Sequence, residues 1–250
     1  MKTEITPPVD MIVKIGSDTA PNFLHSGKHY FYQFLNHNLI TQNSRVLDVG
    51  CGVGRLAIPL TEYFSTGSYE GFDVDDKAIL WCKENITPHH PNFNFNVAEI
   101  HNDFYNSSYN TAACKYKFPY NDNEFDFVFL LSVFTHMMLD DISTYLSEIS
   151  RVLKPNGNCF ITYFILNDES KSLIPSVKNT QQFLYPIKNG LTINYDTPSS
   201  GCAFSEEDIL KLYENNNLKL TNPIFYGRWC GRENCFDYQD VIIAKKCELV

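Results

Sequence analysis

The run VLDVGCGVGR, residues 46 to 55, constrains the fold of this 250-residue chain more than any other part of the sequence. An apolar run is followed by three glycines spaced G-x-G-x-G, which predicts a strand, a tight turn and the start of a helix. Glycine is needed where the backbone turns with positive φ or where a side chain would strike a ligand. The turn is therefore a predicted site of close approach to a nucleotide-like ligand, with Asp48 directly before it.

A second predicted strand, residues 69–73 (YEGFD), also ends in an acid. An acid at this place, about twenty residues past the glycines, is where α/β nucleotide-binding folds hold a ribose diol. Asp75 suits the N-cap of a helix that follows. The glycine spacing is one residue shorter than the dinucleotide fingerprint, which disfavours a nicotinamide oxidoreductase.

The run VLDVGCGVGR followed by GFDVD closely resembles the class I S-adenosylmethionine-dependent methyltransferases. The resemblance continues in NVAEI (96–100), FDFVFLLSVFTHM (125–137) and EISRVLKPNGNCFITYF (148–164), and it covers about residues 44–166. It implies S-adenosylmethionine as cofactor and S-adenosylhomocysteine as product. The implied cofactor-binding residues are Asp48, Gly50, Cys51, Gly52, Gly54, Arg55, Asp73, Val74, Ala98, Glu99 and Ser132.

Within this set the resemblance implies particular roles. Asp73 bonds the ribose hydroxyls, and Glu99, where the family more often has Asp, contacts the adenine amino group. Arg55 pairs with a carboxylate, either that of the donor or that of Asp48, or is a surface arginine.

Strands and helices alternate along the chain, which implies a parallel sheet with helices on both faces. Two further strands close the chain and are predicted to pair as a hairpin. The expected fold is α/β: a doubly wound, mostly parallel seven-stranded sheet whose last strand is antiparallel, in one domain over 1–250. The predicted strands are 45–49, 69–73, 93–97, 125–131, 158–165, 218–226 and 238–245, and the helices 54–65, 75–86, 139–153 and 205–215.

Two segments lie outside this alternation. Residues 1–43 carry apolar and aromatic residues at helical spacing, and the resemblance implies that such a lead-in folds over the cofactor as a lid, with Tyr30 a candidate substrate-binding residue. Packing on the core is the alternative for this segment. Residues 166–203 mix prolines with short β-like runs and are interpreted as an insertion.

His136 directly follows the fourth predicted strand and is the candidate catalytic residue. Ligands of open α/β sheets bind beyond the carboxyl ends of the strands, and a histidine is mostly neutral and basic near pH 7. It serves either as general base or as a pocket-lining residue. Trp229 and Arg232, in a loop between the last two strands, are candidates for substrate binding; the alternative for Trp229 is that it anchors this loop in the core.

The acidic composition, with net charge −9 and pI about 5.2, disfavours nucleic acid as a partner. No apolar run reaches the ~20 residues of a membrane span. Eight cysteines without a C-x-x-C pair indicate reduced core residues in a cytoplasmic protein, and no metal site is nominated. We expect a monomer or homodimer.

The favoured function is methyl transfer to an oxygen or nitrogen of a small molecule, by in-line displacement without a metal. Positioning alone supplies about 7–11 kcal/mol to such a reaction. Two alternatives stay open: a protein side-chain methyltransferase, and a non-catalytic protein that binds S-adenosylmethionine.

Overall fold

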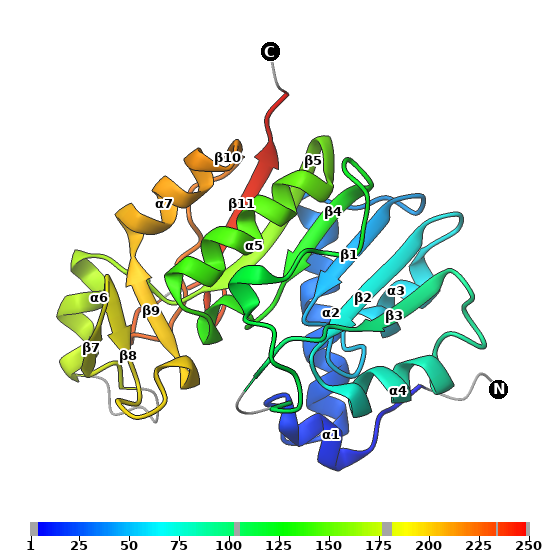
Figure 1. Cartoon of the computed structure of the whole chain (residues 1–250), viewed down its shortest axis with the longest axis horizontal. Coiled ribbons are helices and arrows are strands. Elements are labelled where there is room, and N and C mark those ends of the chain that lie inside the picture. Colours follow the sequence, from blue (N-terminus) through cyan, green and yellow to red (C-terminus); the bar gives the residue numbers. More distant parts are fainter. Residues whose placement is uncertain (1–4, 103–105, 177–181, 234, 249–250) are drawn as a thin grey trace. The chain divides into compact units, whose positions relative to one another are not determined.

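The computed structural model describes residues 5–102, 106–176, 182–233 and 235–248. Its main sheet has seven strands, in the order β10-β11-β5-β4-β1-β2-β3 (Figure 1). Strand β11 pairs antiparallel with both of its neighbours, while β4, β1, β2 and β3 are parallel. The seven strands are β1 (Arg45–Val49), β2 (Ser68–Asp73), β3 (Phe93–Val97), β4 (Phe125–Leu130), β5 (Leu153–Tyr163), β10 (Leu218–Leu220) and β11 (Asp240–Lys246). This confirms the expected fold class.

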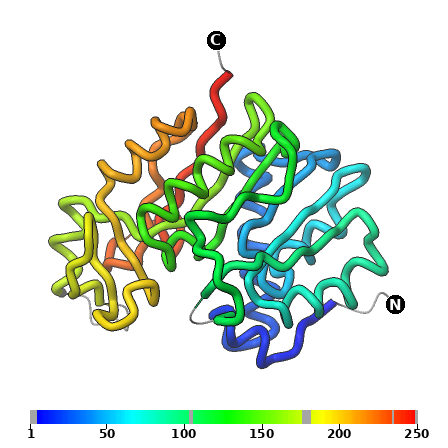
Figure 2. Tube along the Cα trace, viewed as in Figure 1, coloured from blue at the N-terminus to red at the C-terminus, as the bar shows by residue number. Residues whose placement is uncertain are grey.

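The chain divides into two compact units, the first of which holds residues 1–112 and 125–129. The unit contains β1 to β3 and most of β4, and its helices are α1 (Val9–Lys14), α2 (Ala20–Asn36), α3 (Ala57–Tyr63) and α4 (Asp76–Asn85). Apolar side chains of α1, α2 and α4 form one buried cluster with Val53 of the glycine turn. The tube in Figure 2 shows this unit from blue through cyan to green.

Helix α2 is fixed at both ends by contacts that the sequence explains. The Thr19 hydroxyl caps its N-terminus by accepting from Asn22 N, and Pro21 lies in its first turn. Near its C-terminus Phe34 is fully buried and packs against two phenylalanines of β4, with ring centroids 4.9 Å apart in both pairs. The lead-in is thus helical, as predicted.

The second unit holds residues 113–124 and 130–250, and it includes β5, β10 and β11. Its α-helices are α5 (Leu139–Val152), α6 (Asp168–Leu173) and α7 (Glu206–Asn215), with short 3-10 turns η1 (Ala113–Lys115), η2 (Phe134–His136), η3 (Ile174–Ser176) and η4 (Pro198–Ser200). The predicted Ser205 cap of α7 is confirmed, since its hydroxyl accepts from Asp208 N at 3.1 Å.

The insertion builds a small sheet of its own, which the sequence did not predict as a unit. Its strands are β6 (Ile165–Leu166), β9 (Cys202–Ser205), β8 (Gly190–Thr192) and β7 (Tyr185–Ile187), in that order across the sheet. Phe164, Phe183 and Trp229 pack together beside this sheet, with ring centroids 5.1–5.2 Å apart. Short strands and scattered prolines hid this arrangement.

Three predicted boundaries were wrong by three residues or more. The helix expected from residue 54 begins at Ala57, because turns occupy residues 52–56. The strand expected over 218–226 ends at Leu220, and only an isolated bridge joins Phe225 to Val241. Strand β5 begins at Leu153 rather than 158.

Within the described ranges, no helix has the length and apolar character that crossing a membrane requires. All eight cysteines are free thiols.

Candidate functional site

The glycine turn adopts the left-handed backbone that its sequence requires. Gly50, Gly52 and Gly54 have φ of 80°, 51° and 76°. The amides of Gly50 and Cys51 both donate to the Phe72 carbonyl of the neighbouring strand, at 2.9 and 3.1 Å. A Cβ on Gly54 would lie 2.8 Å from Ile86 Cδ1. Conformation and space therefore both select glycine here.

Asp73, at the end of β2, accepts a hydrogen bond from the glycine turn. Its Oδ2 accepts from Gly52 N at 2.7 Å, and its Oδ1 accepts from Asp75 N at 2.9 Å. A carboxylate offers about four acceptor positions, so capacity is left for a vicinal diol. The side chain is half-buried, and burial raises its pKa. These features fit the ribose of the nucleoside that the sequence predicts here.

Asp48 is buried in β1 beneath the turn, with 4% of its surface exposed. The Tyr69 hydroxyl donates to its Oδ2 at 2.6 Å, a contact that the sequence did not reveal. Burial raises the pKa of Asp48 to about 7; the Tyr69 hydrogen bond and the Arg55 charge oppose this, while the Asp73 charge adds to it. A buried carboxyl with such a pKa is typical of functional sites.

Cys51 contributes a neutral thiol to the turn. Its side chain is buried, and burial raises its thiol pKa well above the ordinary value. The Cys51 and Cys82 thiols both face the Gly52 carbonyl, with sulfur–oxygen distances of 3.8 and 3.6 Å. Both thiols therefore pack around the turn as small uncharged groups.

The end of helix α1 lies against the glycine turn. A Cβ on Gly52 would lie 3.4 Å from Ile15 Cγ2, and the Arg55 guanidinium donates to the Ile15 carbonyl at 2.5 Å. Lys14 adds an ion pair to Asp75 at 2.6 Å. Arg55 thus binds the lead-in rather than standing as an isolated surface residue, and Ile15 is a neighbour of the turn that sequence reasoning missed.

The predicted adenine-binding residues lie at the end of β3. Ala98 is buried and donates its amide to the Asp73 carbonyl at 2.8 Å, while the Glu99 side chain is exposed. The Asn106 side chain donates to the Val74 carbonyl at 3.2 Å. The structure therefore joins the ends of β2 and β3 through backbone and side-chain hydrogen bonds. It adds Asn106, whose polar surroundings in the sequence gave no distinguishing pattern.

Ser132 follows β4 and belongs to the second unit. Its φ of 59° is unusual for a residue other than glycine. Its amide donates to Thr162 Oγ1 at 2.8 Å, and its hydroxyl donates to Gln239 Oε1 at 3.0 Å. Backbone held in such a sparsely populated region, by two side chains from distant parts of the sequence, is a feature of functional sites.

His136 ends the turn η2 in the same unit. Phe134 and Thr135 are each 1% exposed and anchor η2, whereas His136 is exposed. Its Nδ1 lies 3.1 Å from the Ser199 carbonyl oxygen. Atoms around the ring desolvate it and lower its pKa below 6.5, and the carbonyls of Ser199 and Ser200 oppose that shift. The imidazole is therefore neutral at pH 7 and able to accept a proton.

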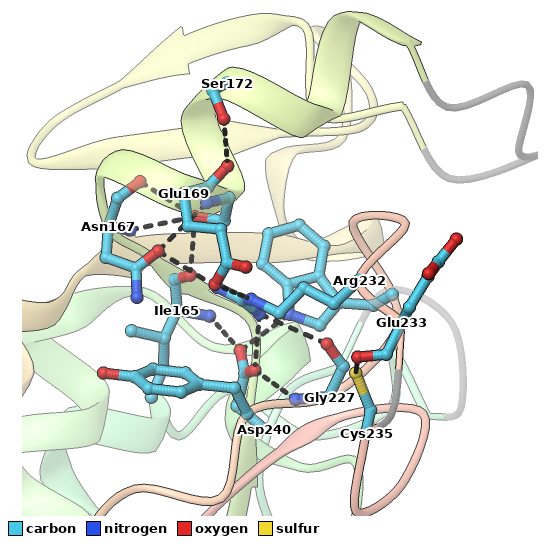
Figure 3. A network of polar contacts seen from close by, with 12 residues as sticks. Ile165, Asn167, Glu169, Ser172, Gly227, Arg232, Glu233, Cys235 and Asp240 are labelled. Carbon is cyan, nitrogen blue, oxygen red and sulfur yellow. Dashed lines mark hydrogen bonds and ion pairs between the residues drawn. The ribbon is translucent and has the colours of Figure 1, made fainter.

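Arg232 lies in a buried polar network around Asp240 (Figure 3), to which Trp229 also contributes a hydrogen bond. Trp229 is 1% exposed, and its indole N–H donates to Asp240 Oδ2 at 2.7 Å. The Arg232 side chain is 4% exposed and contacts Asp240 at 3.2 Å and Glu169 at 2.7 Å. These contacts are those of a structural anchor, the alternative weighed for Trp229. Substrate binding by either residue stays a prediction.

Tyr30, on α2, is half-buried, and its ring lies edge-on to His29 at a centroid distance of 5.2 Å. Its substrate-binding role also stays a prediction. Within the described ranges, His, Cys, Asp and Glu side chains nowhere gather in the threes that a metal ion needs.

Comparison with known proteins gives the family. A family model described as a methyltransferase domain matches residues 47–161. A sterol 24-C-methyltransferase of Schizosaccharomyces pombe is 31% identical over 194 residues, covering 74% of this chain and 46% of that protein. A mitochondrial ubiquinone biosynthesis O-methyltransferase of Dictyostelium discoideum is 26% identical over 186 residues, covering 74% and 53%. The chain thus spans about half the length of these relatives.

A solved structure shows the same fold. A putative sarcosine dimethylglycine methyltransferase from Galdieria sulphuraria superposes with a TM-score of 0.61 at 15% identity, covering 92% of this chain and 87% of that one. The glycine turn, with Asp73 bonded to it, lies within the residues that the family model matches. The chain belongs to the class I S-adenosylmethionine-dependent methyltransferases, which confirms the family and the cofactor that the sequence predicted.

Proposed function

We propose that this chain transfers the methyl group of S-adenosylmethionine to an oxygen or nitrogen atom of a small-molecule acceptor. The observation that carries the proposal is the closure of the glycine turn on Asp73, with Gly52 N 2.7 Å from Oδ2. This contact aligns a backbone turn and a half-buried acid for one nucleoside. S-adenosylmethionine supplies an already activated methyl group when bound, so the protein mainly has to align donor and acceptor.

The chain's own residues have separate tasks in this proposal. Asp73 holds the ribose hydroxyls, Glu99 holds the adenine amino group, and the backbone of the glycine turn approaches the donor. His136 accepts the proton that a hydroxyl or amine loses as the methyl group arrives. Its neutral, exposed imidazole suits that task. The proposal uses no metal, because no acidic pair lies directly after strand β4, where residues 131–137 read LSVFTHM.

The relatives support a small acceptor without specifying the atom. Their names include a sterol 24-C-methyltransferase, a ubiquinone biosynthesis O-methyltransferase and a fatty-acid O-methyltransferase. We propose acceptor-binding roles for Tyr30, for the insertion, and for the loop with Trp229 and Arg232. The net charge of −9 disfavours nucleic acid as acceptor.

The test begins with calorimetric titration of S-adenosylhomocysteine, using NAD as the comparison ligand, and we expect micromolar binding of the first alone. Methyl uptake from labelled donor is then followed over matched hydroxyl, amine and alkene acceptors. For the preferred hydroxyl or amine, His136→Gln should lower kcat at least tenfold, because a general base contributes about 10²–10⁴-fold. Methylation of only carbon acceptors, or only of protein side chains, would contradict the proposal.

The pH dependence provides a second readout of the same enzyme. The pKa of His136 lies below 6.5, so the ring is neutral above that pH and becomes protonated, and inactive as a base, below it. We expect kcat to be constant from pH 7 upward and to fall only below pH 6.5. The fall should be absent from the residual rate of His136→Gln. An acid limb that persists in this variant would assign it to another group.

A further inference from the structure

The turn between β8 and β9, residues 193–201, is braced from several sides. The Thr192 hydroxyl donates to the Pro198 carbonyl at 2.8 Å, and the Cys202 thiol approaches the same oxygen at 3.0 Å. The hydroxyls of Thr197 and Ser200 are 2.8 Å apart, and Ser200 N donates to the Thr197 carbonyl at 2.9 Å. These contacts fix the direction of the backbone carbonyl of Ser199, which lies within the turn.

The Ser199 carbonyl determines which nitrogen of His136 carries the proton. A carbonyl oxygen has no hydrogen to donate, so the 3.1 Å contact forms only when Nδ1 is the donor. A neutral imidazole has a single N–H, and Nε2 is then left with the lone pair. Of the two carbonyls that stabilise the ring, that of Ser199 meets hydrogen-bond geometry.

We propose that the turn 193–201 positions the catalytic base by holding His136 in the Nδ1–H tautomer, with Nε2 as the proton acceptor. The inference rests on the proposed function and deepens it. Ser199, through its carbonyl, and Thr192, through its hydroxyl, are positioning residues. His136 is the group that meets the acceptor.

The proton and electron balance is simple. The acceptor's oxygen or nitrogen forms the new bond to the methyl carbon, and the electron pair of the broken carbon–sulfur bond stays on sulfur. The proton of the acceptor moves to His136 Nε2. The imidazolium so formed keeps its Nδ1–H on the Ser199 carbonyl, and this hydrogen bond strengthens because its donor is now charged. The same carbonyl therefore sets the tautomer and stabilises the product of proton transfer.

The positions of η2 and of the insertion's turn support this arrangement. Phe134 and Thr135 are buried, so η2 fixes the backbone of His136 while its ring reaches the turn. The insertion then does more than add surface, because it provides the group that orients the base. In metal-binding and catalytic histidines, one ring nitrogen is likewise assigned by the hydrogen bond that the other makes.

The first experiment needs no acceptor substrate. We would label the histidines with ¹⁵N, assign His136 by loss of its signals in His136→Gln, and record long-range ¹H–¹⁵N spectra of the full chain at pH 8. The expected result is a preference of about fivefold or more for the Nδ1–H tautomer, as one hydrogen bond imposes. A dominant Nε2–H tautomer, or two equal forms, would overturn the inference. This readout is independent of whether the chain methylates any acceptor.

A variant series separates positioning from general packing. Thr192→Val removes the hydroxyl that braces Pro198, and Thr192→Ser restores it. Thr221→Val removes a hydroxyl contact to the Ile243 carbonyl elsewhere in the same unit and is the control. We expect Thr192→Val alone to bring the tautomer ratio toward one and to lower kcat with little change in S-adenosylhomocysteine affinity. The serine variant should recover both values. An unchanged tautomer in a folded Thr192→Val protein would remove Thr192 from the positioning element.

Discussion

Asp48 and Asp240 are two buried acids on strands of one sheet, and their surroundings differ sharply. Asp240 is fully buried and accepts from four donors: Ile165 N, Gly227 N, Trp229 Nε1 and Arg232. In the described part of the chain Asp48 accepts from Tyr69 alone. Burial raises both pKa values, to about 6 for Asp240 and about 7 for Asp48. The protein supplies Asp240 with a full set of hydrogen-bond donors. Asp48 keeps unused acceptor capacity beneath the glycine turn.

Buried acids therefore have two different roles in this fold. A carboxylate with a full set of donors and a cation holds segments together, and losing it leaves several polar groups without partners. A carboxylate with one neutral donor costs stability in the folded protein, and we interpret it as kept for binding. Three substitutions test this contrast.

The largest expected effect is on stability, from Asp240→Ala. The substitution leaves two backbone amides, the Trp229 indole and the buried Arg232 without their shared acceptor. We expect a loss of about 3–5 kcal/mol in the free energy of unfolding, measured by urea denaturation. Asp240→Asn keeps one acceptor oxygen and should lose less. A loss below about 1 kcal/mol for the alanine variant would break the contrast.

Asp73→Ala is expected to act mainly on donor binding. Loss of charge-assisted hydrogen bonds to the ribose should cost about 1.5–3 kcal/mol in S-adenosylhomocysteine affinity, measured by titration calorimetry. Asp76→Ala, which removes the neighbouring exposed acid, is the matched control and should leave the affinity unchanged. Equal affinities of the wild type and Asp73→Ala would show that the ribose is held elsewhere.

The smallest expected effect, from Asp48→Asn, has the opposite sign. The folded pKa of about 7 exceeds the ordinary 3.8, so between these pH values the unfolded chain has released a proton that the folded chain keeps. Ionisation of Asp48 therefore lowers stability as pH rises through this window. The asparagine variant escapes that loss and should be more stable at pH 7.5 by about 1–2 kcal/mol, with a smaller difference at pH 4.5.

The affinity of the Asp48→Asn variant for S-adenosylhomocysteine should also be lower than that of the wild type. Denaturation at both pH values and calorimetry at pH 7.5 check these two effects together. A variant that is less stable than the wild type at pH 7.5 would assign Asp48 the same structural role as Asp240.

The sequence predicted the region around Asp48 better than the region around Asp240. Strand β1 (Arg45–Val49), the positive-φ glycines and the acid at the end of β2 follow from local patterns, because each depends on neighbours within a few residues. The start of α3 was misplaced because successive turns after Gly54 delay the helix. Tyr69 escaped notice because an aromatic residue in a buried strand looks like core.

The region around Asp240 depends on contacts between residues that are distant in the sequence. Asp240 lay inside the predicted last strand, 238–245, without an assigned role, yet its donors lie 8 to 75 positions away. Trp229 and Arg232 showed the composition of a binding loop, and nothing in the sequence indicated the buried partners that the structure gives them. The Ser199 carbonyl belongs to the backbone, so no side-chain pattern could identify it as the group that contacts His136.

The Asp240 network also bears on the order in which the chain folds. Ribosomes add about 5–20 residues per second, and Asp240 follows its donor Ile165 by 75 positions. About 4–15 seconds of synthesis therefore separate the addition of Ile165 from the addition of Asp240, which accepts its hydrogen bond. Throughout that interval the insertion lacks its attachment to β11, and its apolar cluster around Trp229 is incomplete. Pairing of β11 with β5 then brings the acceptor into place, so this last strand completes the nascent unit.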